Sequence, residues 1–251
     1  MRRKIVAGNW KLHGSRAFAA ALVAEIAAAP PAGVELVVLP PFPYLGELAA
    51  RFAEAGLAFG AQDVSSHDKG AYTGEVAASM LADVGARYTL VGHSERRQYH
   101  AESSELVARK FQAAQSAGLT PILCVGESLD EREAGRTEDV IAEQLRPVLE
   151  LAGVAAFATA VVAYEPVWAI GANGMPATPD YADARQAEIV AVAEDVLGRR
   201  VPCLYGGSVN QGNCAELIAC PHIDGLFIGR SAWAVEGYLD ILARCAATLS
   251  N

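Results

Sequence analysis

The chain contains 251 residues, of which 52% are hydrophobic and 20% are charged, and its formal net charge at pH 7 is −9. This length fits two small domains or one large α/β barrel, and the apolar content is sufficient for a large core. The acidic balance argues against a nucleic-acid partner, because binding along a phosphate backbone requires clustered Lys and Arg. A single small anion can still be held by backbone N–H groups.

The beginning of the chain and the cysteines set further expectations. Met1–Val6 leads into an apolar run that is too short for a signal-peptide core or a membrane span, so we expect a cytoplasmic protein with no membrane partner. The five cysteines lack the paired Cys-x-x-Cys spacing of a zinc or redox site, and we expect them to be reduced.

Short apolar or β-branched runs alternate along the chain with segments of helical periodicity. The expected strands are Lys4–Gly8, Glu35–Leu39, Ala58–Ala61, Tyr88–Val91, Thr120–Val125, Thr159–Ala163, Pro202–Tyr205 and Gly225–Ile228. The expected helices are Ser15–Ala29, Tyr44–Ala55, Val76–Val84, Glu102–Ala117, Val140–Leu151, Asp180–Leu197, Asn213–Ile218 and Tyr238–Leu249. Glycines at 118, 153 and 198 lie where helices should end, and prolines at 43 and 179 lie where helices should begin.

This alternation predicts parallel strands joined by right-handed crossovers, and eight units without a linker favour a closed (β/α)₈ barrel over an open sheet. The alternative, a doubly wound sheet, is disfavoured because Gly8–Gly14 after the first strand lacks the Gly-x-Gly-x-x-Gly pattern. We therefore expect residues 1–251 to form a single catalytic barrel domain. In such barrels the reactive groups lie at the carboxyl ends of the strands.

Asn9 and Lys11 follow the first expected strand. A lysine beyond a strand is often only a solvated loop residue. Lysine is scarce in this chain, however, and Lys11 alone among the lysines lies at the end of a strand on the active face. A cation for an anionic substrate must then come from Lys11 or from an arginine.

His93 follows the fourth expected strand, in the run Val91–Arg97. One interpretation makes Ser94 a helix N-cap, Glu95 a partner of the helix dipole, and Arg96 and Arg97 a solvated surface. His93 has a second interpretation, because positive potential at a helix N-terminus disfavours an imidazolium and keeps the ring neutral. A neutral imidazole can donate a proton to an enolate oxygen and take it back.

Glu165 follows the sixth expected strand and precedes large apolar residues. An apolar cover that closes over this carboxylate would exclude water and increase its basicity, as a base acting on a carbon acid requires. The alternative is a structural ion pair between Glu165 and Lys11 or an arginine, and this segment alone leaves both open.

Glycine-containing loops follow the last two strands, with Gly206, Gly207 and Ser208 in one and Gly229 and Arg230 in the other. Glycine lets a backbone approach an anion closely, and barrels frequently bind phosphate in these two loops. A glycine pair by itself often marks only a tight turn.

Taken together, these segments resemble triosephosphate isomerase over essentially the whole chain. The resemblance rests on the runs at 8–11, 70–75, 91–97, 122–127, 163–171, 205–209 and 224–229. That family is a standard case of a glutamate base with a neutral histidine electrophile and a closing loop.

The resemblance implies interconversion of dihydroxyacetone phosphate and glyceraldehyde 3-phosphate through an enediolate, without a metal or organic cofactor. It assigns Glu165 as the base, His93 as the electrophile, and Lys11 with Asn9 as the groups that stabilise negative charge. Glu95 would support the lysine. Backbone N–H groups around four residues would bind the phosphate of the small triose substrate: Gly171, Ser208, Gly229 and Arg230.

The resemblance also implies a mobile lid over Pro166–Ala177 and a homodimer formed through the loop that contains Thr73 and Glu75. The lid segment is one residue longer than the usual pattern and lacks its lysine, so we expect altered lid kinetics. Arg230 stands where the family usually has a second glycine. Phe227 stands where it often has a leucine against the catalytic carboxylate, opposite Ile170.

Two other functions fit the sequence less well. A Schiff-base aldolase needs a buried lysine at a strand end, usually on the sixth strand, and no lysine follows Lys110 in this sequence. A non-catalytic interaction module would have no reason to combine Glu165, His93 and Lys11 with two phosphate-type loops.

Overall fold

The computed structural model describes residues 4–170 and 177–250. Its strands are β1 (Lys4–Asn9), β2 (Val34–Leu39), β3 (Ala58–Ala61), β4 (Tyr88–Val91), β5 (Thr120–Val125), β6 (Val161–Tyr164), β7 (Cys203–Tyr205) and β8 (Gly225–Ile228). Each strand pairs in parallel with its neighbours in chain order, and β1 closes the barrel against β8 with Ile5 opposite Gly225. The predicted (β/α)₈ barrel is confirmed.

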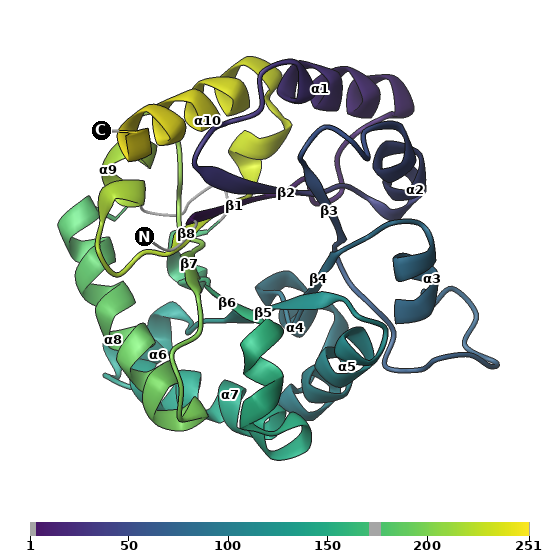
Figure 1. Ribbon diagram of the computed structural model, residues 1–251. Helices are drawn as coiled ribbons and strands as arrows, with labels where there is room; N and C mark the ends of the chain where they lie inside the picture. Colours follow the sequence, from purple (N-terminus) through teal and green to yellow (C-terminus); the bar gives the residue numbers. More distant parts are fainter. Residues whose placement is uncertain (1–3, 171–176, 251) are drawn as a thin grey trace.

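Helices surround the strands, as Figure 1 shows in a view along the barrel. The α-helices of the described residues are α1 (Arg16–Ala28), α2 (Phe42–Arg51), α3 (Ala78–Asp83), α4 (Ser94–His100), α5 (Ser104–Ser116), α6 (Leu129–Glu133), α7 (Thr137–Ala152), α8 (Pro179–Leu197), α9 (Cys214–Ala219) and α10 (Val235–Ser250). Three 3₁₀ helices complete this set: η1 (Val154–Thr159), η2 (Val167–Ala169) and η3 (Arg230–Trp233).

The alternation of side chains along the strands divides the core into two layers. One cluster fills the barrel interior and consists of Ile5, Ala7, Val37, Leu39, Ala58, Tyr88, Leu90, Ile122, Cys124, Val161, Ala163, Leu204 and Phe227. The intervening strand residues, such as Val6 and Val162, belong to the cluster that also contains the buried helix residues. The two-residue period therefore sets which side chains reach the mouth of the barrel.

The expected boundaries hold where local chemistry determines them. Pro179 is the first residue of α8, and the Thr178 hydroxyl accepts a hydrogen bond from the Tyr181 backbone N–H. Gly153 and Gly198 end their helices with φ of +77° and +64°, values that glycine adopts without steric cost.

The observed local structure differs from the expected elements in the sixth strand and in two short helices. The sixth strand begins at Val161 and not at Thr159, because residues Val154–Thr159 form η1, whose Phe157 packs in the core beside Phe111. The short helix α6 was not expected. Helix α4 was missing from the expected helices, although the interpretations of Ser94 and His93 placed the start of a helix there. The start of α6 is marked by a capping box, in which Ser128 and Glu131 exchange hydrogen bonds.

The arginines after His93 do not form a solvated surface. Arg96 forms salt bridges with Glu102 at 2.6 Å and Asp63 at 2.9 Å, and Lys110 bonds to the same two carboxylates. This charged cluster of Asp63, Arg96, Glu102 and Lys110 joins the segment after β3 to the α4–α5 region. Lys110 and Glu102 are buried.

The segment between β3 and α3 extends away from the barrel, and its residues 67–75 are exposed (Figure 1). Among the described residues, no helix is both long enough and apolar enough to cross a membrane. The five cysteines form no disulfide among the described residues, and Cys124, Cys203, Cys214 and Cys245 are buried.

Candidate active site

The carboxyl ends of the strands enclose a cavity of about 520 Å³. Asn9 continues the inward phase of Ile5 and Ala7 on β1, and Glu165 continues the inward phase of Val161 and Ala163 on β6. Most of the predicted site residues line this cavity: Asn9, Lys11, His93, Glu95, Glu165, Ser208, Gly229 and Arg230.

Glu165 is 3% exposed, and both of its carboxylate oxygens have a partner. Oε1 lies 2.9 Å from Nε2 of His93, and Oε2 accepts a hydrogen bond of 3.2 Å from the backbone N–H of Ser94. Burial raises the pKa of Glu165, but His93, the Ser94 N–H and the charge of Lys11 outweigh it and hold the pKa below its ordinary value. The expected increase in basicity is therefore absent from this arrangement.

The geometry around His93 determines which ring nitrogen carries the proton. His93 is the N-cap residue of α4, and its Nδ1 accepts a hydrogen bond of 3.2 Å from the backbone N–H of Glu95. A neutral imidazole whose Nδ1 is an acceptor carries its proton on Nε2. Nε2 then donates to Glu165. The expectation that Ser94 is the N-cap was wrong, because Ser94 is the first residue of the helix.

Lys11 is held by contacts at its backbone and at its side chain. Its φ is +52°, a rare conformation for a non-glycine residue. The side chain of Asn9 accepts from its N–H at 2.9 Å, and Gln62 donates to its carbonyl at 3.0 Å. The ammonium forms a salt bridge with Glu95. The alternative ion pair between Lys11 and Glu165 is thus replaced by Lys11–Glu95.

The two glycine-containing loops lie against each other at the other side of the cavity. The Ser231 hydroxyl donates to the Val209 carbonyl at 3.1 Å, and Asn213 donates to the Ser208 carbonyl at 2.9 Å. Gly229 faces the lysine, since a Cβ there would lie 3.4 Å from Cε of Lys11. Backbone groups of both loops therefore border the space next to Lys11.

Phe227 and Ile170 both line the cavity, as expected for two apolar groups near the carboxylate. The Phe227 ring meets the His93 ring edge to face at 6.0 Å. A Cβ at position 206 would lie 3.1 Å from Cγ of Glu165 and 3.2 Å from Cδ1 of Phe227. Gly206 therefore leaves room for the bulkier phenylalanine beside the carboxylate.

Several residues that support the site were not predicted from the sequence. Glu127, 1% exposed, accepts hydrogen bonds from the Tyr164 hydroxyl at 3.1 Å and from Nε1 of Trp168 at 2.9 Å. Burial raises the pKa of Glu127, and these hydrogen bonds offset it only in part. The sequence did contain a signal for Glu127, namely a carboxylate just after the fifth strand. The same kind of signal identified Glu165 after the sixth strand. Gln62 had no comparable signal.

Gly171 and the inserted lid residues up to position 176 lie outside the described residues, as does the altered lid pattern. The described part of the lid segment includes η2. The Arg132 guanidinium lies over the Trp168 ring, 3.9 Å from its centroid. The expectations about phosphate binding at Gly171 and about lid kinetics stay predictions.

Comparison with known proteins agrees with this architecture. The family model for triosephosphate isomerase matches residues 4–245. The triosephosphate isomerase of Xanthomonas campestris pv. campestris strain 8004 is 63% identical over 98% of this chain and 99% of its own. That of Stenotrophomonas maltophilia strain K279a is 62% identical over the same shares. The chain therefore belongs to the triosephosphate isomerase family of intramolecular isomerases.

Proposed function

We propose that this chain interconverts dihydroxyacetone phosphate and D-glyceraldehyde 3-phosphate, with Glu165 as the base and His93 as the electrophile. The observation that carries the proposal is the contact of 2.9 Å between Oε1 of Glu165 and Nε2 of His93, two buried side chains that line the cavity. A carbon acid needs a base for the C–H proton and a donor for the oxygen that becomes negative, and this pair supplies both.

The reaction begins when substrate replaces the partners of the carboxylate. Glu165 leaves the Ser94 N–H and the His93 ring, and takes a proton from carbon 1 of dihydroxyacetone phosphate. Nε2–H of His93 then faces the carbonyl oxygen on carbon 2, where negative charge develops. The Lys11 ammonium, with the side-chain amide of Asn9, stabilises the resulting enediolate.

The second half returns the proton. His93 gives its Nε2 proton to the oxygen on carbon 2 and takes the hydroxyl proton from the oxygen on carbon 1. Glu165 delivers its proton to carbon 2, which yields glyceraldehyde 3-phosphate and restores both side chains. All proton transfers use side chains of the chain itself, so the proposed reaction needs no metal or organic cofactor.

The phosphate group of the substrate is placed against the loops that follow β7 and β8. Backbone N–H groups at Ser208, Gly229 and Arg230 are the proposed donors, together with Gly171, which lies outside the described residues. Glu95 keeps the Lys11 ammonium beside Gly229. The substrate would thus lie between the acid–base pair and these loops.

We also propose that the chain is a single catalytic domain, acts in the cytoplasm and forms a homodimer through the loop that contains Thr73 and Glu75. Residues 67–75 are exposed, Tyr72 is 46% exposed, and Leu12 beside Lys11 is 96% exposed. Pairing of these apolar groups between two copies would remove them from water. Sedimentation of wild type and Tyr72→Asp tests this proposal: a dimer that becomes monomeric supports it, and a monomeric wild type contradicts it.

Isomerisation in deuterated water tests the proposed reaction. Dihydroxyacetone phosphate is supplied with a chelator present, and the product is trapped by an NAD-linked dehydrogenase. We expect rapid product formation, with solvent deuterium incorporated only at carbon 2. Product without deuterium at carbon 2 would exclude a base that exchanges its proton with solvent, and absence of product would exclude the isomerase assignment.

A further inference from the structure

The charges that line the active-site cavity are unfavourable for a phosphate dianion if Arg230 is left out. Among the described residues, the other ionised side chains of the lining are Lys11, Glu95 and Glu165. Lys11 and Glu95 form a salt bridge and compensate each other. Glu165 then leaves one net negative charge in the cavity of a chain that carries −9 overall. An incoming dianion would meet repulsion at the site and around it.

Arg230 is the remaining cation among the described residues of that lining. Within residues 4–170 and 177–250, no salt bridge or hydrogen bond involves this side chain, which is exposed. Arginines on flanking elements are different: Arg200 lies 2.6 Å from Asp224, and Arg244 lies 2.7 Å from Asp240. Arg230 thus keeps its full charge and all its donors for a ligand.

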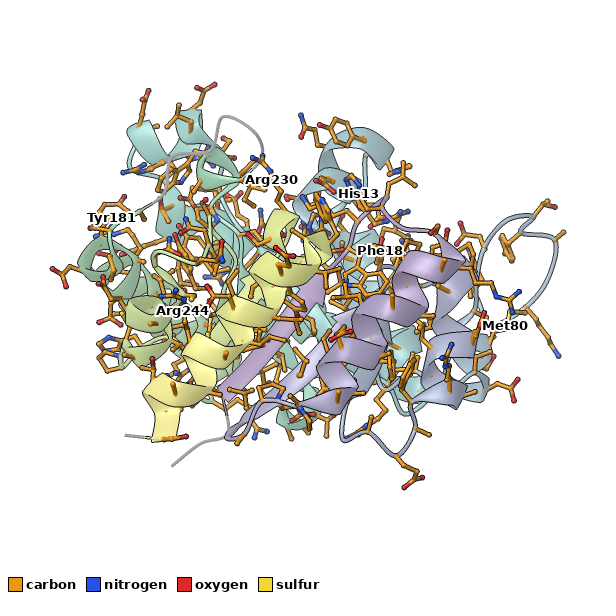
Figure 2. The ribbon with its side chains drawn as sticks, turned by 90° about the horizontal axis from the view of Figure 1, so that it is seen from above. His13, Phe18, Met80, Tyr181, Arg230 and Arg244 are labelled. Atoms are coloured by element: carbon orange, nitrogen blue, oxygen red, sulfur yellow. The ribbon has the colours of Figure 1, made fainter. Side chains whose placement is uncertain are left out.

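The backbone and the surroundings place Arg230 where the phosphate is expected. Arg230 begins η3 directly after Gly229, and its φ is not positive, so a side chain is accommodated without strain. It shares the cavity lining with Ser208 and Trp233. Figure 2 shows Arg230 and His13 at the same end of the molecule, near the N-terminal end of α10. His13 stacks on Trp233, the last residue of η3, with ring centroids 3.9 Å apart.

We propose that the guanidinium of Arg230 is a side-chain ligand of the substrate phosphate and supplies the positive charge that attracts the dianion to this cavity. This inference rests on the proposed function and adds a residue to its binding site. A planar guanidinium can donate to two phosphate oxygens at once, which a backbone N–H cannot do. The phosphate takes no part in the bond changes at carbons 1 and 2, so Arg230 acts on binding and not on proton transfer.

Binding of inorganic phosphate tests the inference without turnover. Wild type, Arg230→Gln and Arg230→Lys are compared by calorimetry, with Arg244→Gln as the control for loss of an exposed arginine. We expect phosphate to bind about 10-fold more weakly to Arg230→Gln, and Arg230→Lys to lie between, because a charge-assisted hydrogen bond contributes roughly that factor. Arg244→Gln should bind as wild type. Equal phosphate affinity for wild type and Arg230→Gln would overturn the inference.

Steady-state kinetics give the second measurement. We expect KM of Arg230→Gln to rise about 10-fold with kcat within about 2-fold of wild type, since uniform binding is lost. Its kcat/KM should depend less on ionic strength, because salt screens the interaction that was removed. An unchanged KM and salt dependence in an active enzyme would refute the inference and leave the proposed function intact. Arg230-dependent phosphate binding in a protein that does not isomerise would refute the function alone.

Discussion

The main chain of Glu165 passes directly against Gly126: a Cβ atom at position 126 would lie 1.8 Å from the Glu165 carbonyl oxygen. Gly126 follows β5, and the side chain of Gln144 bonds both its N–H, at 2.8 Å, and its carbonyl, at 2.9 Å. The Glu165 N–H in turn donates to the Val125 carbonyl at 2.7 Å. The position of the proposed catalytic carboxylate therefore depends on a glycine that does not line the cavity.

Gly126→Ala should displace Glu165 and lower kcat by about 100-fold, because a shift of the order of 1 Å in a catalytic group costs about that factor. The measurement is steady-state kinetics, with unfolding in urea to show that the variant is folded. Gly237→Ala is the matched control, since a Cβ there meets nothing closer than 3.7 Å. A wild-type kcat in Gly126→Ala would show that the close contact does not position the base.

Gln62→Ala should weaken the placement of Lys11. Gln62 donates to the Lys11 carbonyl at 3.0 Å and to the Leu39 carbonyl at 2.9 Å, and it thereby holds a backbone with φ of +52°. Loss of these bonds should lower stability by about 1–2 kcal/mol and kcat/KM by about 10-fold. Gln112→Ala, at an exposed position of α5, is the control. If both variants behave alike in the isomerase assay and in urea, Gln62 has no positioning role.

The lowered pKa of Glu165 predicts how stability changes with pH. Because the folded state binds this proton less readily than the unfolded state, ionised Glu165 stabilises the fold above the ordinary glutamate range. That stabilisation is lost as pH falls through the pKa of the folded state. Urea unfolding of wild type and Glu165→Gln between about pH 3 and 7 measures it. The difference in the free energy of unfolding between wild type and Glu165→Gln should shrink toward acid pH. A difference that grows toward acid pH would mean that burial dominates and raises the pKa of Glu165.

Lys110→Met should strongly destabilise the fold. Lys110 is buried and bonds Asp63 at 2.7 Å and Glu102 at 2.6 Å, so its removal leaves two carboxylates with only Arg96. Breaking a buried ionic cluster in this way costs about 3–5 kcal/mol. Lys69→Met, at an exposed position, should be neutral in the same urea titration. Equal stability of the two variants would show that Lys110 contributes no net stability to the fold.

The sequence predicted the barrel because alternation and termination are local properties. Strand runs, Pro179 and Gly198 could be read directly, and the convergence of strand ends then brought Asn9, His93 and Glu165 to one cavity. The same local reasoning identified Lys11 but not its positive φ, which depends on the distant Gln62.

The features that the sequence did not predict are contacts between distant segments or very short secondary-structure elements. The N-cap of α4 is His93 and not Ser94, because the His93 imidazole accepts a hydrogen bond from the Glu95 N–H. Serine is the more common residue at a helix N-cap, so the sequence favoured Ser94. The contact of Gly126 with Glu165 arises from the pairing of β5 with β6. The sequence of neither segment contains a pattern that predicts this contact.

The most direct test of the central claim is kcat for glyceraldehyde 3-phosphate isomerisation by wild type, Glu165→Asp and Glu165→Gln. Aspartate shortens the base by one methylene and draws the carboxylate back from carbon, so kcat should fall by about 100-fold or more with a modest change in KM. The kcat of Glu165→Gln should fall further, because glutamine cannot accept the proton. An inactive wild type, or a wild-type kcat in either variant, would contradict the assignment of Glu165 as the base.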